Sequence, residues 1–174
     1  MKRQLIKIAE TTHPDLKRKL ADLAMVETLR DCEIDCISLL RRAAFSSVLS
    51  PASPEEREAA FAVLDEITPR CDRRIFDLAV QFPDSMKEKM GELATVGHVV
   101  ARGGRDLLEA TALFYALKPA SPEERSAALD LLEKIGIVGN ARQFITLVRI
   151  GQLDVSDIEA FIKLQLELSI RNHR

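Results

Sequence analysis

The residues whose types and spacing suggest metal chemistry begin with Glu10 and His13. Their E-x-x-H spacing places both side chains on one face of a helix, as in carboxylate-bridged di-iron sites. Such a site needs a second E-x-x-H motif and further glutamates, and the sequence contains no second motif. His13 also precedes Pro14, which indicates a helix boundary. We therefore expect no metal at this position.

The cysteines form a second candidate. Cys32 and Cys36 are four residues apart, and two thiolates at that spacing would supply half of a zinc site. No second pair follows at ligand spacing, so Cys71 and His98 would complete the set only through the tertiary fold. We expect the cysteines to be small core residues and expect no cofactor, but leave a redox or metal role open. Their odd count without framework spacing favours a reducing compartment, and we expect a cytoplasmic protein.

Acid–base and phosphate chemistry have little support. Asp31, Glu33 and Asp35 would provide carboxylates for proton transfer, although a solvated acidic turn is the ordinary interpretation. The pair Gly103-Gly104 is too short to cradle a phosphate, and no serine lies in a G-x-S-x-G motif. The sequence therefore predicts a protein without enzymatic activity. An enzyme whose site is assembled from distant residues remains the alternative.

The heptapeptide PASPEER occurs twice, at residues 51–57 and 119–125. Each copy holds a serine, then a proline, and a glutamate three residues after the serine, which is the pattern of a capping box at a helix start. The serine oxygen accepts from a free helix N–H, and the glutamate reaches back to the serine N–H. We interpret both copies, through Ser53 and Ser121, as structural helix starts.

The similarity extends beyond the heptapeptide. Residues 39–80 and 107–148 align without gaps with 18 of 42 positions identical, which indicates an internal duplication with an offset of 68 residues. Two further S-x-x-E boxes begin at Ser85 and Ser156, so the four serines recur about every 34 residues. That period is usual for helical repeat proteins. We expect either an α-solenoid-like stack or a compact duplicated bundle.

The composition favours one all-α domain. The 174 residues are 47% hydrophobic and 30% charged, with seven Gly, seven Pro, one Tyr and no Trp. We expect an antiparallel array of nine or ten helices, with an N-terminal cap (1–24), repeat 1 (25–92), repeat 2 (93–160) and a C-terminal helix end and tail (161–174). The expected helices cover residues 3–10, 15–34, 36–49, 54–67, 70–82, 86–102, 105–118, 122–135, 140–150 and 157–171.

One segment carries two patterns. Residues 160–170 nearly alternate between apolar and polar, which is typical of a strand. The same stretch also has Ile158, Ile162, Leu166 and Ile170 at a spacing of four, which is typical of a helix. Its Leu, Gln, Glu and Lys residues favour helix. We expect a helix and leave the strand open.

The charge pattern directs the functional hypothesis. The net charge of −2 gives no general support for nucleic-acid binding, and no apolar run approaches the ~20 residues needed to span a membrane. We expect an interaction module, such as an adaptor, chaperone or regulator, and leave its oligomeric state open. If consecutive helices are antiparallel, one edge gathers arginines for an acidic partner protein. Nucleic acid is the alternative partner. In the purely structural interpretation, the arginines pair within the chain with Asp31, Glu33, Asp35 and Asp72. The edge gathers Arg30, Arg41, Arg42, Arg70, Arg73, Arg74, Arg102, Arg105 and Arg142, and the expected partner-binding residues among them are Arg41, Arg42, Arg70, Arg73, Arg74, Arg102 and Arg105.

Overall fold

Every regular element that the structure describes is a helix. The computed structural model describes residues 7–8, 10–29, 36–68, 73–94, 104–136 and 140–173, and these contain no strand. The expected all-α class is therefore confirmed for this part of the chain. The elements are α2 (Pro14–Leu29), α3 (Cys36–Leu49), α4 (Pro54–Ile67), α5 (Arg73–Ala79), α6 (Asp84–Leu93), α7 (Gly104–Leu117), α8 (Pro122–Ile135), α9 (Asn140–Arg149), the 3-10 turn η1 (Val155–Asp157) and α10 (Ile158–Arg171).

The two PASPEER copies start α4 and α8, as predicted. The Ser53 hydroxyl accepts from the Glu56 N–H at 3.1 Å, and the Ser121 hydroxyl accepts from the Glu124 N–H at 3.2 Å. The second copy closes the box, because the Glu124 carboxylate accepts from the Ser121 N–H at 3.2 Å. In both copies the glutamate carboxylate also accepts from the N–H of the preceding alanine, Ala52 for Glu56 and Ala120 for Glu124. Both serines are thus N-caps, and the second copy adds the bond from the serine N–H.

The other two expected capping boxes are wrong. Helix α6 begins at Asp84 after an N-cap at Pro83, so Ser85 already lies inside the helix. Its hydroxyl is engaged elsewhere, because it donates to the Glu124 carboxylate. Ser156 lies within η1, and the residue that caps this turn is Asp154, which accepts from the Ser156 N–H at 3.1 Å. A local S-x-x-E pattern therefore does not outweigh a neighbouring proline or aspartate.

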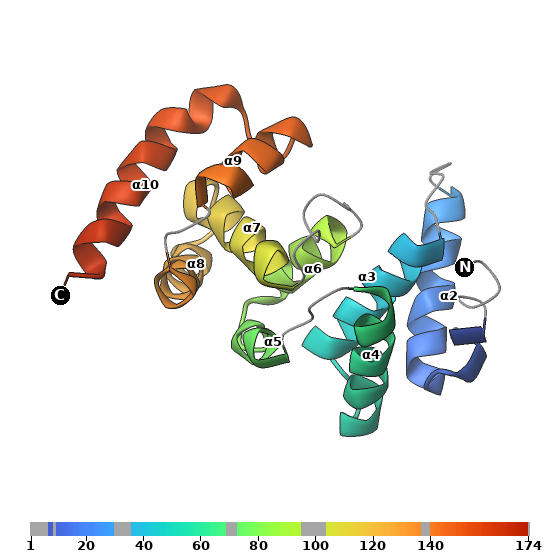
Figure 1. Ribbon diagram of the computed structural model, residues 1–174. Coiled ribbons are helices and arrows are strands. Elements are labelled where there is room, and N and C mark those ends of the chain that lie inside the picture. The colour runs from blue at the N-terminus through green and yellow to red at the C-terminus, as the bar shows by residue number, and fades with distance from the viewer. Residues whose placement is uncertain are drawn as a thin grey trace.

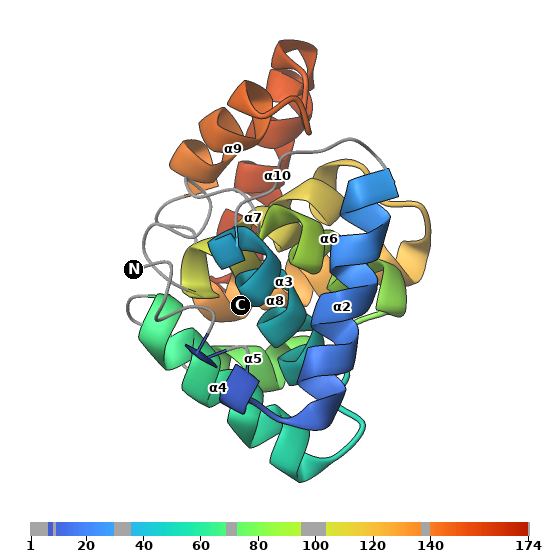
Figure 2. The ribbon, with the colours of Figure 1, turned by 90° about the vertical axis from the view of Figure 1, so that its right-hand side faces the viewer.

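The helices follow one another across the molecule from α2 at one side to α10 at the other (Figure 1). Helix α2 packs on α3 and α4, α6 lies between α3 and α7, and α9 and α10 both contact α7. Figure 2, a view from the α2 side, shows α2 in front with α9 and α10 at the top of the picture. Helix α7 is central, because 11 of its 14 residues are buried.

Aromatic rings fill the centre between α3, α4 and α5. The Phe76 ring lies 5.2 Å from that of Phe45 and 6.1 Å from that of Phe61, measured between centroids. Gly104 begins α7 directly against this cluster, where a Cβ atom would overlap the Phe76 ring. The missing side chain of Gly104 therefore lets α7 approach α5 closely.

The segment with two patterns forms α10, so the helix prediction for residues 160–170 is confirmed. Two expected helices are shorter where they are described: α5 ends at Ala79 rather than residue 82, and Ala94 is the C-cap of α6. None of the described helices has the length and apolarity to cross a membrane.

Candidate functional site

Arg73 is the best defined member of the expected arginine edge. It donates from the first turn of α5 to two carboxylates of α4, Glu58 at 2.8 Å and Asp65 at 3.3 Å. Its guanidinium also lies over the Phe61 ring, 4.7 Å from the centroid. The bond to Glu58 is the main reason why the pKa of Arg73 is raised. Arg73 therefore joins α5 to α4 within the chain.

The acids that pair with Arg73 differ from those that the sequence suggested. The suggested internal partners, Asp31, Glu33, Asp35 and Asp72, lie outside the described residues. Glu58 and Asp65 are seven residues apart on α4, so they share one helix face. This spacing of seven residues is the feature of the sequence that could have indicated Glu58 and Asp65 as two acids available to one arginine.

The other described arginines have neighbours on several different helices. Arg105 donates to the Ile135 carbonyl at 2.6 Å and so satisfies the end of α8, where helix carbonyls lack partners. Arg41 donates to the Ala94 carbonyl at 3.5 Å, at the end of α6. Arg42 lies on α3 and Arg74 is exposed on α5. The described polar contacts thus bring Arg73, Arg105 and Arg41 to three separate helix ends or faces, while Arg70 and Arg102 lie outside the described residues.

The remaining metal candidates receive no support from the described residues. Glu10 is exposed, and His13 accepts from the Asp15 N–H at 3.3 Å through its Nδ1 atom, which places it at the start of α2. No group of three metal-binding side chains occurs in the described part of the chain. Cys32, Cys71 and His98 lie outside that part, as does the side chain of Cys36.

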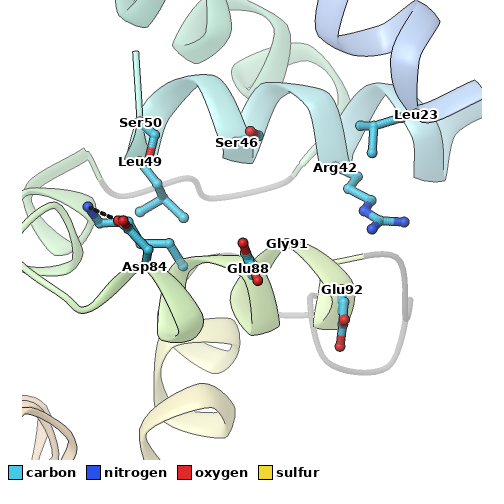
Figure 3. A pocket seen from close by; sticks show the side chains of 10 residues that line it. Leu23, Arg42, Ser46, Leu49, Ser50, Asp84, Glu88, Gly91 and Glu92 are labelled. Atoms are coloured by element: carbon cyan, nitrogen blue, oxygen red, sulfur yellow. Dashed lines mark hydrogen bonds and ion pairs between the residues drawn. The ribbon is translucent and has the colours of Figure 1, made fainter. Parts of the chain in front are cut away.

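A groove of about 730 Å³ lies between α3 and α6 (Figure 3). Arg42 reaches from α3 towards α6 in this view, and Lys87 pairs with Asp84 at 3.4 Å. The groove mixes both signs of charge, so it does not select a purely acidic or purely basic partner. Its lining consists of Leu23, Arg42, Ser46, Leu49, Ser50, Asp84, Lys87, Glu88, Gly91 and Glu92.

Polar side chains are buried between α7 and α9, which the sequence interpretation missed. Asp106, Glu109, Asn140 and Gln143 are all buried, and each has at least one side-chain oxygen without a hydrogen-bond partner among the described residues. Arg142 of α9 lies 3.6 Å from Asp106. The available sequence signal was the pair Asp106 and Glu109, two acids about one turn apart in a helix that is mostly apolar.

Burial raises the pKa of Glu109 to about 7, and the nearby Asp106 charge adds to the effect. Arg105 and Arg142 oppose the shift without cancelling it. A carboxyl that titrates near neutrality is suited to proton transfer. Glu109 is only 2% exposed, however, so a substrate has no access to it in this arrangement. Its chemistry is therefore that of a buried, pH-sensitive group at a helix interface.

The inner face of α10 holds this helix on the rest of the molecule. Leu164 and Leu168 are buried, and the Phe161 ring stacks on Phe144 with 4.6 Å between centroids. At the edge of this face, Arg125 of α8 donates to the Glu167 carboxylate at 2.7 Å. These contacts supply an apolar core and an ion pair without any residue of the outer face.

The outer face of α10 carries a second apolar row, which we call the α10 row. It consists of Ile158, Ile162, Leu166 and Ile170, which are 48%, 54%, 62% and 60% exposed. Their spacing of four residues predicted a helix, and the structure places all of them on the solvent side. A shallow hollow of about 460 Å³ lies beside Leu166 and Ile170. The outer face of α10 is therefore a row of neighbouring apolar side chains with a shallow hollow at one end.

No protein-family profile, curated protein or solved structure matches this chain.

Proposed function

We propose that the chain is a protein–protein interaction module and that the α10 row is its docking surface. The observation that carries this proposal is the exposure of four large apolar side chains in a row on one helix. Large contiguous apolar surfaces mark interaction sites, whereas single exposed apolar side chains are ordinary. Helix α10 is already anchored through Leu164 and Leu168, so the row is not needed to hold it in place.

The proposal includes an internal duplication as the origin of the array. The bounds of α3 and α4 shifted by 68 residues are those of α7 and α8, which agrees with the duplication expected from the sequence. After α4 come α5 and then α6, which α7 contacts; after α8 come α9 and then α10. If α10 corresponds to α6 in the second copy, its outer face corresponds to the surface that α7 covers on α6, and is therefore suited to contact another helix. Repeat arrays bind partners through such surfaces and carry no inherent chemistry.

The experiment is capture by the immobilised full chain from a lysate of its source, with mass spectrometry of the retained proteins. The double change Ile162→Glu and Leu166→Glu adds charge to the docking surface and should abolish specific retention. Ile145→Glu is the matched control, because Ile145 is 51% exposed on α9. Retention that survives the double change in a folded variant would exclude the α10 row.

The arginine edge is a second, separate surface through which the chain could act as an interaction module, and its proposed partner is an acidic protein. Arg73 is unsuited to test it, because reversal to Glu would place a third negative charge beside Glu58 and Asp65. Arg74→Glu, on the same helix, is the better variant. Weaker capture, with less salt dependence in the binding that remains, would support this second surface, and unchanged capture would remove Arg74 from it.

A further inference from the structure

We propose that the partner of the α10 row is a second copy of this chain, paired antiparallel along α10. The inference deepens the proposed function and rests on it, because it assigns an occupant to the same surface. It stands on two features of the outer face: the shape of the hollow and the order of charges beside the apolar row.

The hollow has the arrangement that receives a helix side chain. Its lining includes Lys163, Leu166, Glu167 and Ile170, which are related as i, i+3, i+4 and i+7. Four side chains at this spacing form the hole into which a neighbouring helix inserts one knob. The hollow can therefore receive a side chain from a neighbouring helix. A copy of α10 would supply isoleucine and leucine knobs from its own row.

A row of alternating charges runs beside the apolar row, one residue further along the chain. At a spacing of four residues it has the order acid, base, acid, base: Glu159, Lys163, Glu167 and Arg171. Glu159 and Lys163 are exposed. Glu167 and Arg171 keep about a third of their side-chain surface exposed while pairing with Arg125 and Asp130. All four side chains can therefore contribute to the electrostatic potential at the outer face of α10.

Two-fold symmetry decides the orientation of the two copies. In an antiparallel pair, the axis lies across the helices, so the charged row of one copy faces the charged row of the other. In a parallel pair packed through the apolar rows, the axis lies along the helices, so the two charged rows lie on opposite sides of the contact and do not meet. Only the antiparallel pair brings the two charged rows together.

The sequence of charges then sets the register. With the axis at the level of Gln165, Glu159 of one copy meets Arg171 of the other, and Lys163 meets Glu167. Each contact occurs twice, so every charge of the row faces its opposite. In the same register, the apolar side chains of the two copies alternate along the axis and interdigitate.

The first experiment measures the mass of the purified full chain by light scattering and sedimentation velocity over a concentration series. We expect a monomer–dimer equilibrium. Ile162→Glu with Leu166→Glu should give a folded monomer, and Ile145→Glu should dimerise like the parent chain. A parent chain that stays monomeric up to its solubility limit would overturn the inference, as would a dimer unaffected by the double change.

The second experiment tests the register through charge. Lys163→Glu and Glu167→Lys should each weaken self-association about tenfold or more, because each places like charges opposite one another twice. Mixing the two variants should restore association, because the mixed pair has opposite charges at both contacts. Absence of restoration with both variants folded would overturn the antiparallel register. If loss of the Arg125 contact unfolds Glu167→Lys, the exposed Glu159→Lys replaces it, and unchanged association of that variant would equally overturn the register.

The two proposals fail in different ways. A monomeric chain that captures another protein through the α10 row would overturn self-pairing and leave the proposed function standing. A monomeric chain whose capture of other proteins is unchanged by Ile162→Glu with Leu166→Glu would overturn both proposals.

Discussion

The Lys19 ammonium lies 2.7 Å from the carboxylate of Glu56, whose side chain is fully buried. Lys19 belongs to α2 and Glu56 to the first turn of α4, so this ion pair joins two elements. Burial alone would raise the pKa of Glu56. Hydrogen bonds from Lys19, from the Ser47 hydroxyl at 2.6 Å and from the Ala52 N–H outweigh burial, and the pKa is lowered. The charged form of Glu56 is thus stabilised in the fold.

Removing the Lys19 charge should destabilise the chain. We expect Lys19→Met to lower the free energy of unfolding by about 1–3 kcal/mol, because a buried carboxylate loses its cation. Lys17→Met, at an exposed position of the same helix, should change it by less than about 0.5 kcal/mol. Urea unfolding near neutral pH measures both. Equal effects of the two changes would show that the ion pair adds nothing.

Acid should weaken the same contact. Because the pKa of Glu56 is lowered by folding, its contribution is present above the unfolded value of about 4.5 and is lost as pH falls through the folded value. In a pH series, Lys19→Met should show less of this acid-dependent loss than the parent chain.

Glu109 should produce the opposite pH dependence. Folding raises its pKa from 4.5 to about 7, so between these values the folded chain holds a proton that the unfolded chain has lost. The free energy of unfolding should therefore fall as pH rises across this window, by up to on the order of 3 kcal/mol. Glu109→Gln should flatten that fall, as measured by urea unfolding at several pH values. An identical slope in the variant would contradict the assignment to Glu109.

Two glycines in helices should respond to alanine with opposite signs. At Gly104 a Cβ would overlap the fully buried Phe76 ring, so Gly104→Ala should cost about 1–3 kcal/mol. At Gly91, in α6, a Cβ would meet nothing within 4 Å. Gly91→Ala should therefore stabilise the chain by about 0.5–1 kcal/mol, because alanine is the better helix former. Thermal unfolding of the two variants compares them directly, and a shared sign would refute the packing described here.

The two capping serines should be structural. Ser53→Ala and Ser121→Ala should each lower the free energy of unfolding by about 0.5–2 kcal/mol, since each removes the acceptor of a helix N–H. Capture of a partner by the folded fraction should be unchanged. Loss of capture at unchanged stability would instead identify PASPEER as a recognition motif.

The sequence by itself determined where most helices lie. The expected segments 36–49, 54–67 and 122–135 coincide with α3, α4 and α8. Capping serines, prolines and apolar periodicity act over one or two helical turns, so they can be read locally. The same local signals were insufficient at Ser85, where the preceding Pro83 and a bond to Glu124 of another helix decided the outcome.

Only the tertiary structure decided which face of α10 is buried. The sequence contains two apolar rows on this helix, and the more regular one, from Ile158 to Ile170, is exposed. Phe161, Leu164 and Leu168 face the core because Phe144 and the helices α7 and α8 lie on that side. The contact of Arg73 with Glu58 and the burial of Glu109 between α7 and α9 likewise depend on how separate helices pack together. A periodic pattern specifies a helix and its faces, but the free energy of burial depends on the neighbour that each face meets.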